Sequence, residues 1–202
     1  MGLLLIGLQG ALAAPGHSTI LVFGDSLSAA YGLPARQGWA ALLQERMHEQ
    51  GYGYHVVNAS ISGETTSGGL QRLPRALRVD RPAIVVLELG ANDGLRGLPL
   101  ALIRTNLAQM IRLCERAGAR VLLLGIRLPP NYGPRYGDEF AALYVDLARQ
   151  FHLPLVPFLL AGVALKPALM QADGLHPDAA GEPLVLDNVW QTLKPMLTRP
   201  AH

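Results

Sequence analysis

One serine and one histidine in this chain have neighbours that could make them a nucleophile and its base. Ser26 ends the tripeptide Gly24, Asp25, Ser26, which follows an apolar run, and His176 lies three residues after Asp173. A serine hydroxyl is a weak nucleophile at neutral pH, so it needs an imidazole to accept its proton and a third group to fix the tautomer of that imidazole. Together the two segments suggest a serine hydrolase with Ser26, Asp173 and His176 as its catalytic residues.

Each segment also has an ordinary structural interpretation. Asp25 and Ser26 are residue types that frequently cap a helical turn, and such a turn could start at Leu27. A cluster of Asp, Gly and His is more often an exposed turn than a catalytic loop, and Pro177 could simply begin the last helix. Neither segment alone separates a catalytic site from a turn.

Two more residues supply groups that suit an oxyanion. Gly63 ends the sequence Ser60 to Gly63, and Asn92 lies in the sequence Gly90 to Asp93, each after a strand-like run. A glycine NH, an asparagine amide and the NH of Ser26 itself can donate to a tetrahedral oxyanion, although Gly and Asn are also common turn residues. Four separately weak signals at convergent positions are much stronger jointly, and they predict an oxyanion hole of Ser26, Gly63 and Asn92.

The elements that must position these residues alternate between strand-like and helical patterns. Five apolar runs are typical of strands: Thr19 to Phe23, Tyr54 to Asn58, Ala83 to Leu89, Arg120 to Gly125 and Leu155 to Phe158. Between these runs, two sets of apolar residues have helical spacing. The first is Trp39, Leu42, Leu43 and Met47, and the second is Leu102, Leu107, Met110, Ile111 and Cys114. The pattern predicts an α/β fold, a three-layer, doubly wound parallel sheet of about five strands, whose ligands bind beyond the carboxyl ends of the strands.

Length and charge narrow the class of protein. The chain has 202 residues, half of them hydrophobic, which suits a single domain over residues 15–202. Its formal charge is +2, and its 17 Lys and Arg residues form no run, which argues against nucleic acid as a partner. We expect a monomer that acts on a small-molecule ester or lipid. A noncatalytic nucleotide-binding module is disfavoured because the first strand is followed by no GxGxxG fingerprint.

The first residues have the pattern of an export signal. Residues 1–14 are apolar and end in Ala11, Leu12, Ala13, a small-residue pattern typical of signal-peptidase sites, although no Lys or Arg precedes the apolar run. The pattern predicts a signal peptide, and a periplasmic or secreted enzyme after its removal. Since Pro15 closes the run before the roughly 20 residues that a membrane span needs, we expect no stable membrane anchor.

The sequence predicts neither a metal nor a cofactor. The remaining histidines, which are His17, His48, His55, His152 and His202, have no paired acid at a suggestive spacing. Cys114 is the sole cysteine, so no intramolecular disulfide can form, and we expect a buried, inert thiol. The loop from Leu128 to Tyr136 is stiffened by prolines, and Tyr132, Pro134 and Tyr136 are candidates for a substrate pocket or, equally, for an ordinary strand-to-helix connection.

These residues resemble the SGNH, or GDSL, hydrolases, whose four named residues match Ser26, Gly63, Asn92 and His176 in chain order. The segments Asn58 to Thr66, Leu128 to Tyr136 and Met170 to Ala172 are similar to the bacterial TesA-type group of arylesterases, lysophospholipases and thioesterases. Ala91 and Glu64 stand where many relatives have Gly and Asp.

The resemblance implies a flavodoxin-like SGNH hydrolase fold and ester hydrolysis through an acyl-serine intermediate, with aryl and acyl esters, lysophospholipids and acyl thioesters as substrates. A carbohydrate O-deacetylase on the same fold is the alternative enzyme.

Overall fold

Five strands form one parallel sheet in the order β2-β1-β3-β4-β5. The structure is a computed structural model, and it describes residues 19–198. The strands are β1 (Thr19–Gly24), β2 (His55–Asn58), β3 (Ile84–Glu88), β4 (Arg120–Leu124) and β5 (Leu155–Val156). The predicted doubly wound parallel sheet is therefore confirmed. β5 ends earlier than predicted because Pro157 has no NH with which to continue the ladder.

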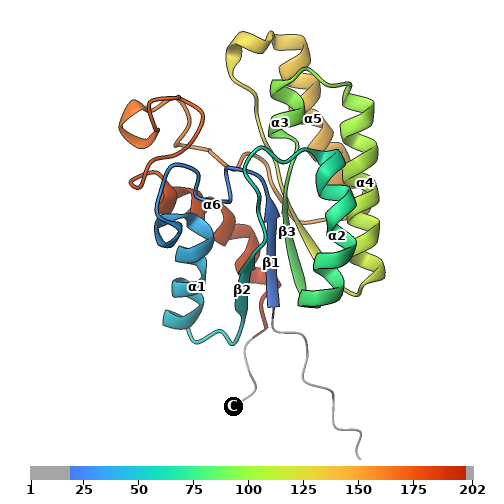
Figure 1. Cartoon of the computed structure of the whole chain (residues 1–202), viewed down its shortest axis with the longest axis vertical. Helices are drawn as coiled ribbons and strands as arrows, with labels where there is room; N and C mark the ends of the chain where they lie inside the picture. Colours follow the sequence, from blue (N-terminus) through green and yellow to red (C-terminus); the bar gives the residue numbers. More distant parts are fainter. Residues whose placement is uncertain (1–18, 199–202) are drawn as a thin grey trace, which may run out of the picture.

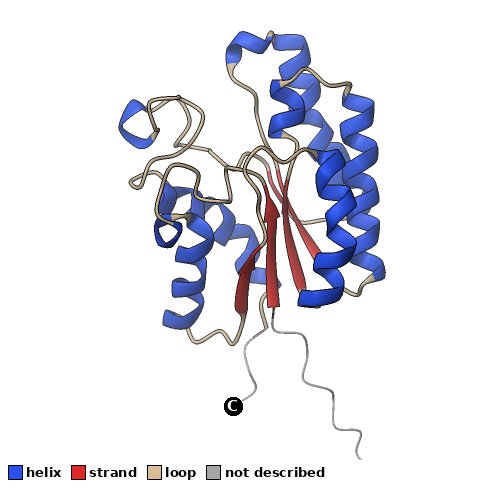
Figure 2. Cartoon of the chain, viewed as in Figure 1, coloured by secondary structure: helices blue, strands red, loops and turns tan. Residues whose placement is uncertain are grey.

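Helices cover both faces of the sheet, as Figures 1 and 2 show. On one side lie α1 (Trp39–Glu49) and α6 (Glu182–Leu193), which contact each other. On the other side lie α2 (Thr66–Asp80), α4 (Leu100–Arg116) and α5 (Pro134–Phe151), and α4 contacts both of its neighbours. The arrangement is the three-layer α/β/α architecture that alternating strands and helices predict.

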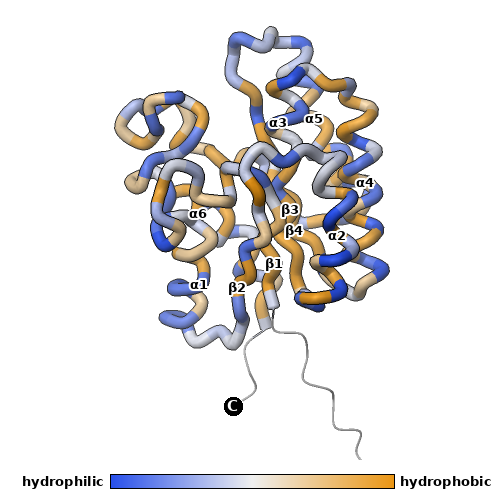
Figure 3. Tube along the Cα trace, in the orientation of Figure 1, coloured by the Kyte–Doolittle hydropathy of each residue, from blue (hydrophilic) through white to orange (hydrophobic). Residues whose placement is uncertain are grey.

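The core lies on both faces of the central strands β1 and β3, whose side chains are buried almost throughout. Figure 3 shows these strands as the apolar centre of the molecule. Continuous apolar strands are expected where helices cover both faces of a parallel sheet. The exception is Glu88, a fully buried acid at the carboxyl end of β3.

The predicted helix faces are confirmed with one correction. Trp39, Leu43 and Met47 of α1 are fully buried. In α4, Leu102 is 41 % exposed, so its assignment to the apolar face was wrong. Its neighbour Ile103 takes the buried position, because Ile103, Leu107, Met110, Ile111 and Cys114 share one helical face. Burial raises the pKa of the Cys114 thiol to about 12, which agrees with the inert thiol that the sequence predicts.

The carboxyl ends of all five strands meet at one edge of the sheet, where the loops after β1, β2, β3 and β4 converge (Figure 2). The short helix α3 (Ala91–Leu95) follows β3 at this edge. Within residues 19–198, the helices lack the length and apolarity needed to cross a membrane. The predicted signal peptide, residues 1–14, lies outside the described residues.

Candidate active site

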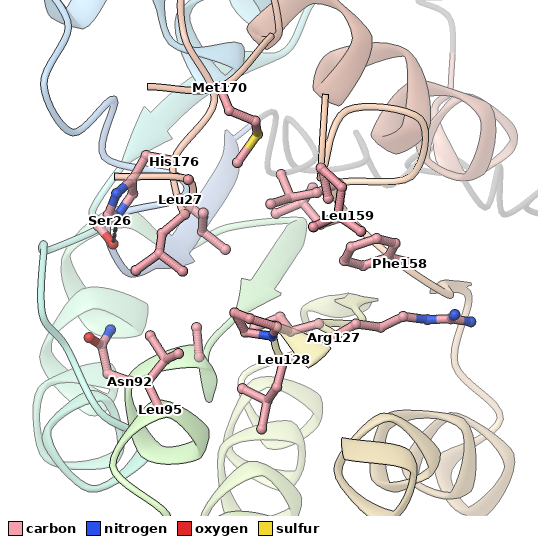
Figure 4. A pocket seen from close by; sticks show the side chains of 18 of the residues that line it. Ser26, Leu27, Asn92, Leu95, Arg127, Leu128, Phe158, Leu159, Met170 and His176 are labelled. Atoms are coloured by element: carbon pink, nitrogen blue, oxygen red, sulfur yellow. Dashed lines mark hydrogen bonds between the residues drawn. The ribbon is translucent and has the colours of Figure 1, made fainter. Parts of the chain in front are cut away.

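Ser26, His176 and Asp173 form a continuous chain of hydrogen bonds at this edge. Ser26 Oγ lies 2.8 Å from Nε2 of His176, and Nδ1 of His176 lies 2.6 Å from Oδ2 of Asp173. Figure 4 marks the bond between Ser26 and His176 with a dashed line. The imidazole can take the hydroxyl proton at one nitrogen while the carboxylate holds the other nitrogen protonated. The fold thus brings together three residues that the sequence singled out.

Asp173 organises the loop that carries its own partner. Its Oδ1 accepts the backbone NH groups of Leu175 (2.9 Å) and His176 (3.1 Å), while Oδ2 faces the imidazole. Gly174 has a φ of 67°, the left-handed conformation that lets the loop fold back on the carboxylate. Partial burial alone would raise the pKa of Asp173, but the hydrogen bonds from His176 and Leu175 outweigh it and lower the pKa. Asp173 is therefore ionised at neutral pH.

Gln171 fastens this loop to the turn that follows the serine. Its Nε2 donates to the carbonyl of Tyr31 (2.7 Å), in the turn that follows Ser26, and to the carbonyl of Pro177 (2.8 Å), in the loop that carries His176. The rings of Tyr31 and His176 also contact each other, with centroids 4.5 Å apart. Sequence reasoning noted Gln171 only as part of a resemblance and missed this bridging role, because nothing local connects it to Tyr31.

Asp25 stabilises the turn that carries Ser26 from its buried side. The Asp25 side chain is fully buried, and its Oδ1 accepts the NH of Leu27 at 3.0 Å. The capping interpretation therefore holds for Asp25, whereas the hydroxyl of Ser26 is directed to His176. The tripeptide thus combines a capping acid with a hydroxyl placed beside an imidazole, and the catalytic role of Ser26 stays a prediction.

Asn92, at the start of α3, lies against both the serine turn and the turn after β2. Its Nδ2 donates to Oδ2 of Asp25 (3.1 Å) and to the carbonyl of Glu64 (3.0 Å). An amide nitrogen carries two protons, and both are already donated here. An oxyanion would therefore have to share one of them with Asp25 or Glu64. The amide is thereby fixed beside Ser26, with which it lines the same pocket.

Two backbone NH groups complete the set of predicted oxyanion donors. Gly63, with a φ of 79°, lies directly before Glu64, whose carbonyl accepts the Asn92 amide. Within residues 19–198, the NH groups of Ser26 and Gly63 donate to no other protein group. NH groups without a protein acceptor are suited to an incoming oxygen, and of the two residues Ser26 lines the pocket.

A second carboxyl group lies beneath Asp25. Oε2 of Glu88 accepts the NH of Asp25 (3.2 Å) and the hydroxyl of Ser28 (2.9 Å), and a Cβ on Gly24 would meet this oxygen at 2.5 Å. Burial raises the pKa of Asp25 to about 6, and burial together with the charge of Asp25 raises the pKa of Glu88 well above its ordinary value. Two adjacent buried carboxyls cannot both ionise readily, so we assign the retained proton to Glu88. The sequence analysis missed Glu88, although an acid in an otherwise apolar strand could have singled it out.

Arg72 of α2 braces the turn that carries Gly63. Its guanidinium pairs with Glu64 (2.6 Å) and donates to the carbonyls of Ala59 (2.6 Å) and Gly24 (3.3 Å). It also lies over the Phe23 ring, 3.8 Å from the centroid. The substitution of Glu64 for the expected Asp therefore preserves an acidic partner for Arg72. No spacing in the sequence pointed to this residue.

An apolar pocket of about 480 Å³ opens beside Ser26 and His176 (Figure 4). Apolar side chains from several loops line it, among them Leu27, Leu95, Ile126, Leu128, Phe158 and Met170. Ser26 and His176 lie at one end, and the guanidinium of Arg127 extends from the other. Pockets that bind acyl or aryl groups are mostly apolar with few polar groups, as this one is.

The three residues predicted to form the pocket do not line it. The hydroxyls of Tyr132 and Tyr136 donate to the carbonyls of Leu95 (3.1 Å) and Leu98 (2.8 Å), and Pro134 begins α5. The same loop contributes Leu128, Pro129 and Pro130 to the lining instead. Tyr132 and Tyr136 therefore support the pocket wall from outside.

The described residues contain no group of three or more His, Cys, Asp or Glu side chains arranged to hold a metal ion. The acids and the histidine of the site are engaged in the hydrogen bonds described above.

Comparisons with known proteins agree with this geometry. Residues 22–183 match the GDSL-like Lipase/Acylhydrolase family. The chain is 57 % identical to Esterase TesA of Pseudomonas aeruginosa over 179 residues, which cover 89 % of each chain. It is 44 % identical to thioesterase 1/protease 1/lysophospholipase L1 of Escherichia coli, over 91 % of this chain and 87 % of that protein.

Solved structures give the same result. A crystal structure of TesA superposes with a TM-score of 0.87, over 89 % of this chain and 99 % of the other. A Pseudoalteromonas esterase inhibited by monoethylphosphonate is 41 % identical and superposes with a TM-score of 0.85, over 89 % of this chain and 98 % of the other. With its matching family segment and these relatives, the chain belongs to the GDSL-like lipase/acylhydrolase family.

Proposed function

We propose that this protein is a serine esterase that hydrolyses acyl and aryl esters through an acyl-Ser26 intermediate. The observation that carries the proposal is the hydrogen-bonded chain from Ser26 through His176 to Asp173 at the end of an apolar pocket. The names of the relatives, which include an arylesterase and a thioesterase/lysophospholipase, extend the proposed substrates to lysophospholipids and acyl thioesters.

The proposed reaction has two halves. Nε2 of His176 accepts the hydroxyl proton as Ser26 Oγ attacks the carbonyl carbon, and Asp173 stabilises the resulting imidazolium. The oxyanion is met by the NH groups of Ser26 and Gly63 and by the Asn92 amide. His176 then protonates the leaving alkoxide or thiolate. In the second half, His176 deprotonates a water molecule that attacks the acyl-serine, and the acid leaves with Ser26 restored.

Active-site labelling tests the nucleophile. Incubation with a fluorophosphonate should add one mass adduct to Ser26 and abolish hydrolysis of p-nitrophenyl butyrate. Ser26→Ala should lose both the adduct and turnover, whereas Ser67→Ala, on α2, should keep both. An adduct on another residue, or turnover by a folded Ser26→Ala protein that matches the unmodified enzyme, would refute the assignment.

The pocket lining favours an acyl chain over a sugar, because the side chains that surround it are mainly apolar. A series of p-nitrophenyl esters of increasing acyl length, with acetylated xylan beside it, separates an acyl esterase from a carbohydrate deacetylase. We expect the rate to rise with acyl length until the pocket is filled, and acetate release from xylan to be negligible.

The proposal also includes export as a monomer. The apolar pattern of residues 1–14 supports removal of a leader and a periplasmic or secreted location. The intact mass of protein recovered from the periplasmic fraction tests the removal, and sedimentation velocity tests the oligomeric state.

A further inference from the structure

Four exposed apolar side chains lie in loops at the carboxyl edge of the sheet, where the pocket opens. They are Tyr31, Ile61, Leu165 and Leu175, which are 50 %, 51 %, 76 % and 36 % exposed, and we call this set the apolar rim. Leu165 and Leu175 line the pocket itself. Tyr31 contacts the His176 ring, and Ile61 lies in the turn that carries Gly63, its NH bonded to the carbonyl of Gly24.

The apolar rim differs from the other exposed apolar side chains in its location. Those side chains lie singly on separate helices: Val79 on α2, Leu102 on α4, Val145 on α5 and Leu184 on α6. Isolated apolar side chains of this kind are normal on protein surfaces, whereas a group at one opening marks an interaction site.

The rim is continuous with the pocket. Leu165 and Leu175 both line the pocket and reach solvent, so they connect its apolar lining with the outer surface. Leu165 has a φ of 65°, a backbone conformation that residues with side chains rarely adopt.

Basic side chains flank the rim. Lys166 directly follows Leu165, Arg127 extends from the pocket, and Arg96 lies near Gly63, 3.5 Å from its carbonyl. In the part of the chain from 19 to 198, none of these three cations has an ion pair with a carboxylate. Of the neighbouring acids, Glu64 pairs with Arg72, and Asp173 is held in hydrogen bonds with His176 and Leu175.

From these features we infer that the apolar rim docks on the surface of aggregated, negatively charged lipid, and that acyl chains pass from the aggregate into the pocket. This inference rests on the proposed esterase function and specifies the physical state of its substrate. A protein partner seated on the rim would cover the entrance and exclude substrate, whereas a lipid surface supplies the substrate at the same place. The flanking cations complement the charge of such a surface.

Vesicle co-sedimentation tests the inference. The vesicles consist of diether phosphatidylglycerol, which has no carboxylic ester to hydrolyse, or of diether phosphatidylcholine as the neutral counterpart. We expect the processed chain, from which the apolar residues 1–14 have been removed, to bind phosphatidylglycerol vesicles, more weakly as salt rises, and to prefer them over phosphatidylcholine. Leu165→Ser and Ile61→Ser should each weaken binding by about tenfold, the effect of removing one apolar side chain from the lipid.

Matched variants separate the contributions. Val79→Ser removes an equally exposed apolar side chain far from the entrance and should leave binding unchanged. Lys166→Glu keeps Leu165 and should weaken binding to phosphatidylglycerol only. All of these positions are exposed, so the substitutions should leave the fold intact, which thermal unfolding checks.

Three outcomes would overturn the docking inference. They are absence of vesicle binding by the unmodified protein, equal binding by the Leu165→Ser and Val79→Ser variants, and self-association without lipid that Leu165→Ser abolishes. Hydrolysis of the soluble ester p-nitrophenyl acetate is measured in parallel. If that activity persists while vesicle binding is absent, the docking inference fails and the esterase function stands.

Discussion

The side-chain amide of Asn92 donates a hydrogen bond to the buried carboxylate of Asp25 over 3.1 Å. Asp25 precedes Ser26 in the chain, so the turn that presents the hydroxyl also orients the amide that faces the developing charge. One buried acid thereby sets the relative position of the proposed nucleophile and the proposed oxyanion donor, and the two can be tested separately.

Replacement of Asn92 by alanine should lower kcat by about a hundredfold to a thousandfold, because it removes one oxyanion donor. KM should change little, since the donor is needed in the transition state more than in substrate binding. Steady-state hydrolysis of p-nitrophenyl butyrate measures both constants. A higher KM at unchanged kcat would instead assign Asn92 to substrate binding.

Asp25→Asn should weaken the same donor in a pH-dependent manner. Burial raises the pKa of Asp25 from 3.8 to about 6, so the unmodified enzyme holds Asn92 with an ionised acceptor only above pH 6. The variant has a neutral side chain at every pH. We therefore expect the ratio of unmodified to variant kcat to increase as pH rises through 6, and to approach a constant at higher pH.

The ratio of the two profiles is the informative quantity, because groups that the substitution does not affect contribute equally to both profiles. Profiles between pH 4.5 and 9 with one soluble ester are sufficient. A ratio that stays flat across this range would show that the charge of Asp25 has no part in orienting Asn92.

Asp173→Asn should reduce kcat by about a thousandfold or more, since an amide can hold the imidazole in the wrong tautomer. Asp178→Asn is the matched control: it lies in the same segment, and its carboxylate accepts the NH groups of Ala180 and Gly181 without contacting His176. Comparable losses in both variants would indicate a general disturbance of the loop rather than a role for Asp173 in catalysis.

Glu182→Gln should change how stability depends on pH. The Glu182 carboxyl, which accepts the NH of Trp39 at 2.7 Å, has its pKa raised from 4.5 to about 7 by burial. Between these values the folded protein keeps a proton that the unfolded chain has released. The free energy of unfolding therefore falls as pH rises from 4.5 to 7, by roughly 3 kcal/mol at most, and is constant above that range.

The glutamine variant keeps an acceptor for Trp39 but has no proton to lose. Urea unfolding of both proteins at several pH values between 4.5 and 8 gives the difference in free energy of unfolding, in which the contributions of Asp25 and Glu88 cancel. We expect the variant to gain stability relative to the unmodified protein as pH rises. A difference that is independent of pH would contradict the raised pKa.

The residues that the sequence revealed lie at strand ends or within a few positions of a partner. Ser26, Gly63 and Asn92 follow apolar runs, and Asp173 lies close enough to His176 for one loop to hold both. The end of β5 was predicted too late, although Pro157 lay within the predicted strand and could have marked it.

The residues that the sequence did not reveal act over long separations. Arg72 reaches Gly24 and Gln171 reaches Tyr31 through contacts that only the assembled sheet creates. The tyrosines of the loop after β4 illustrate the same limit. Tyr132 and Tyr136 were candidates for the substrate pocket because they are aromatic. In the structure, their hydroxyls instead donate to the carbonyls of Leu95 and Leu98.

Ser26 and His176 are separated by 150 positions along the chain and meet through a loop that Gln171 fastens to Tyr31. An incomplete chain that ends before this loop contains the serine without its base, and so it cannot hydrolyse esters. The nucleophile is activated only once the last part of the chain has docked on the first. Ester turnover is therefore a direct report of completed folding.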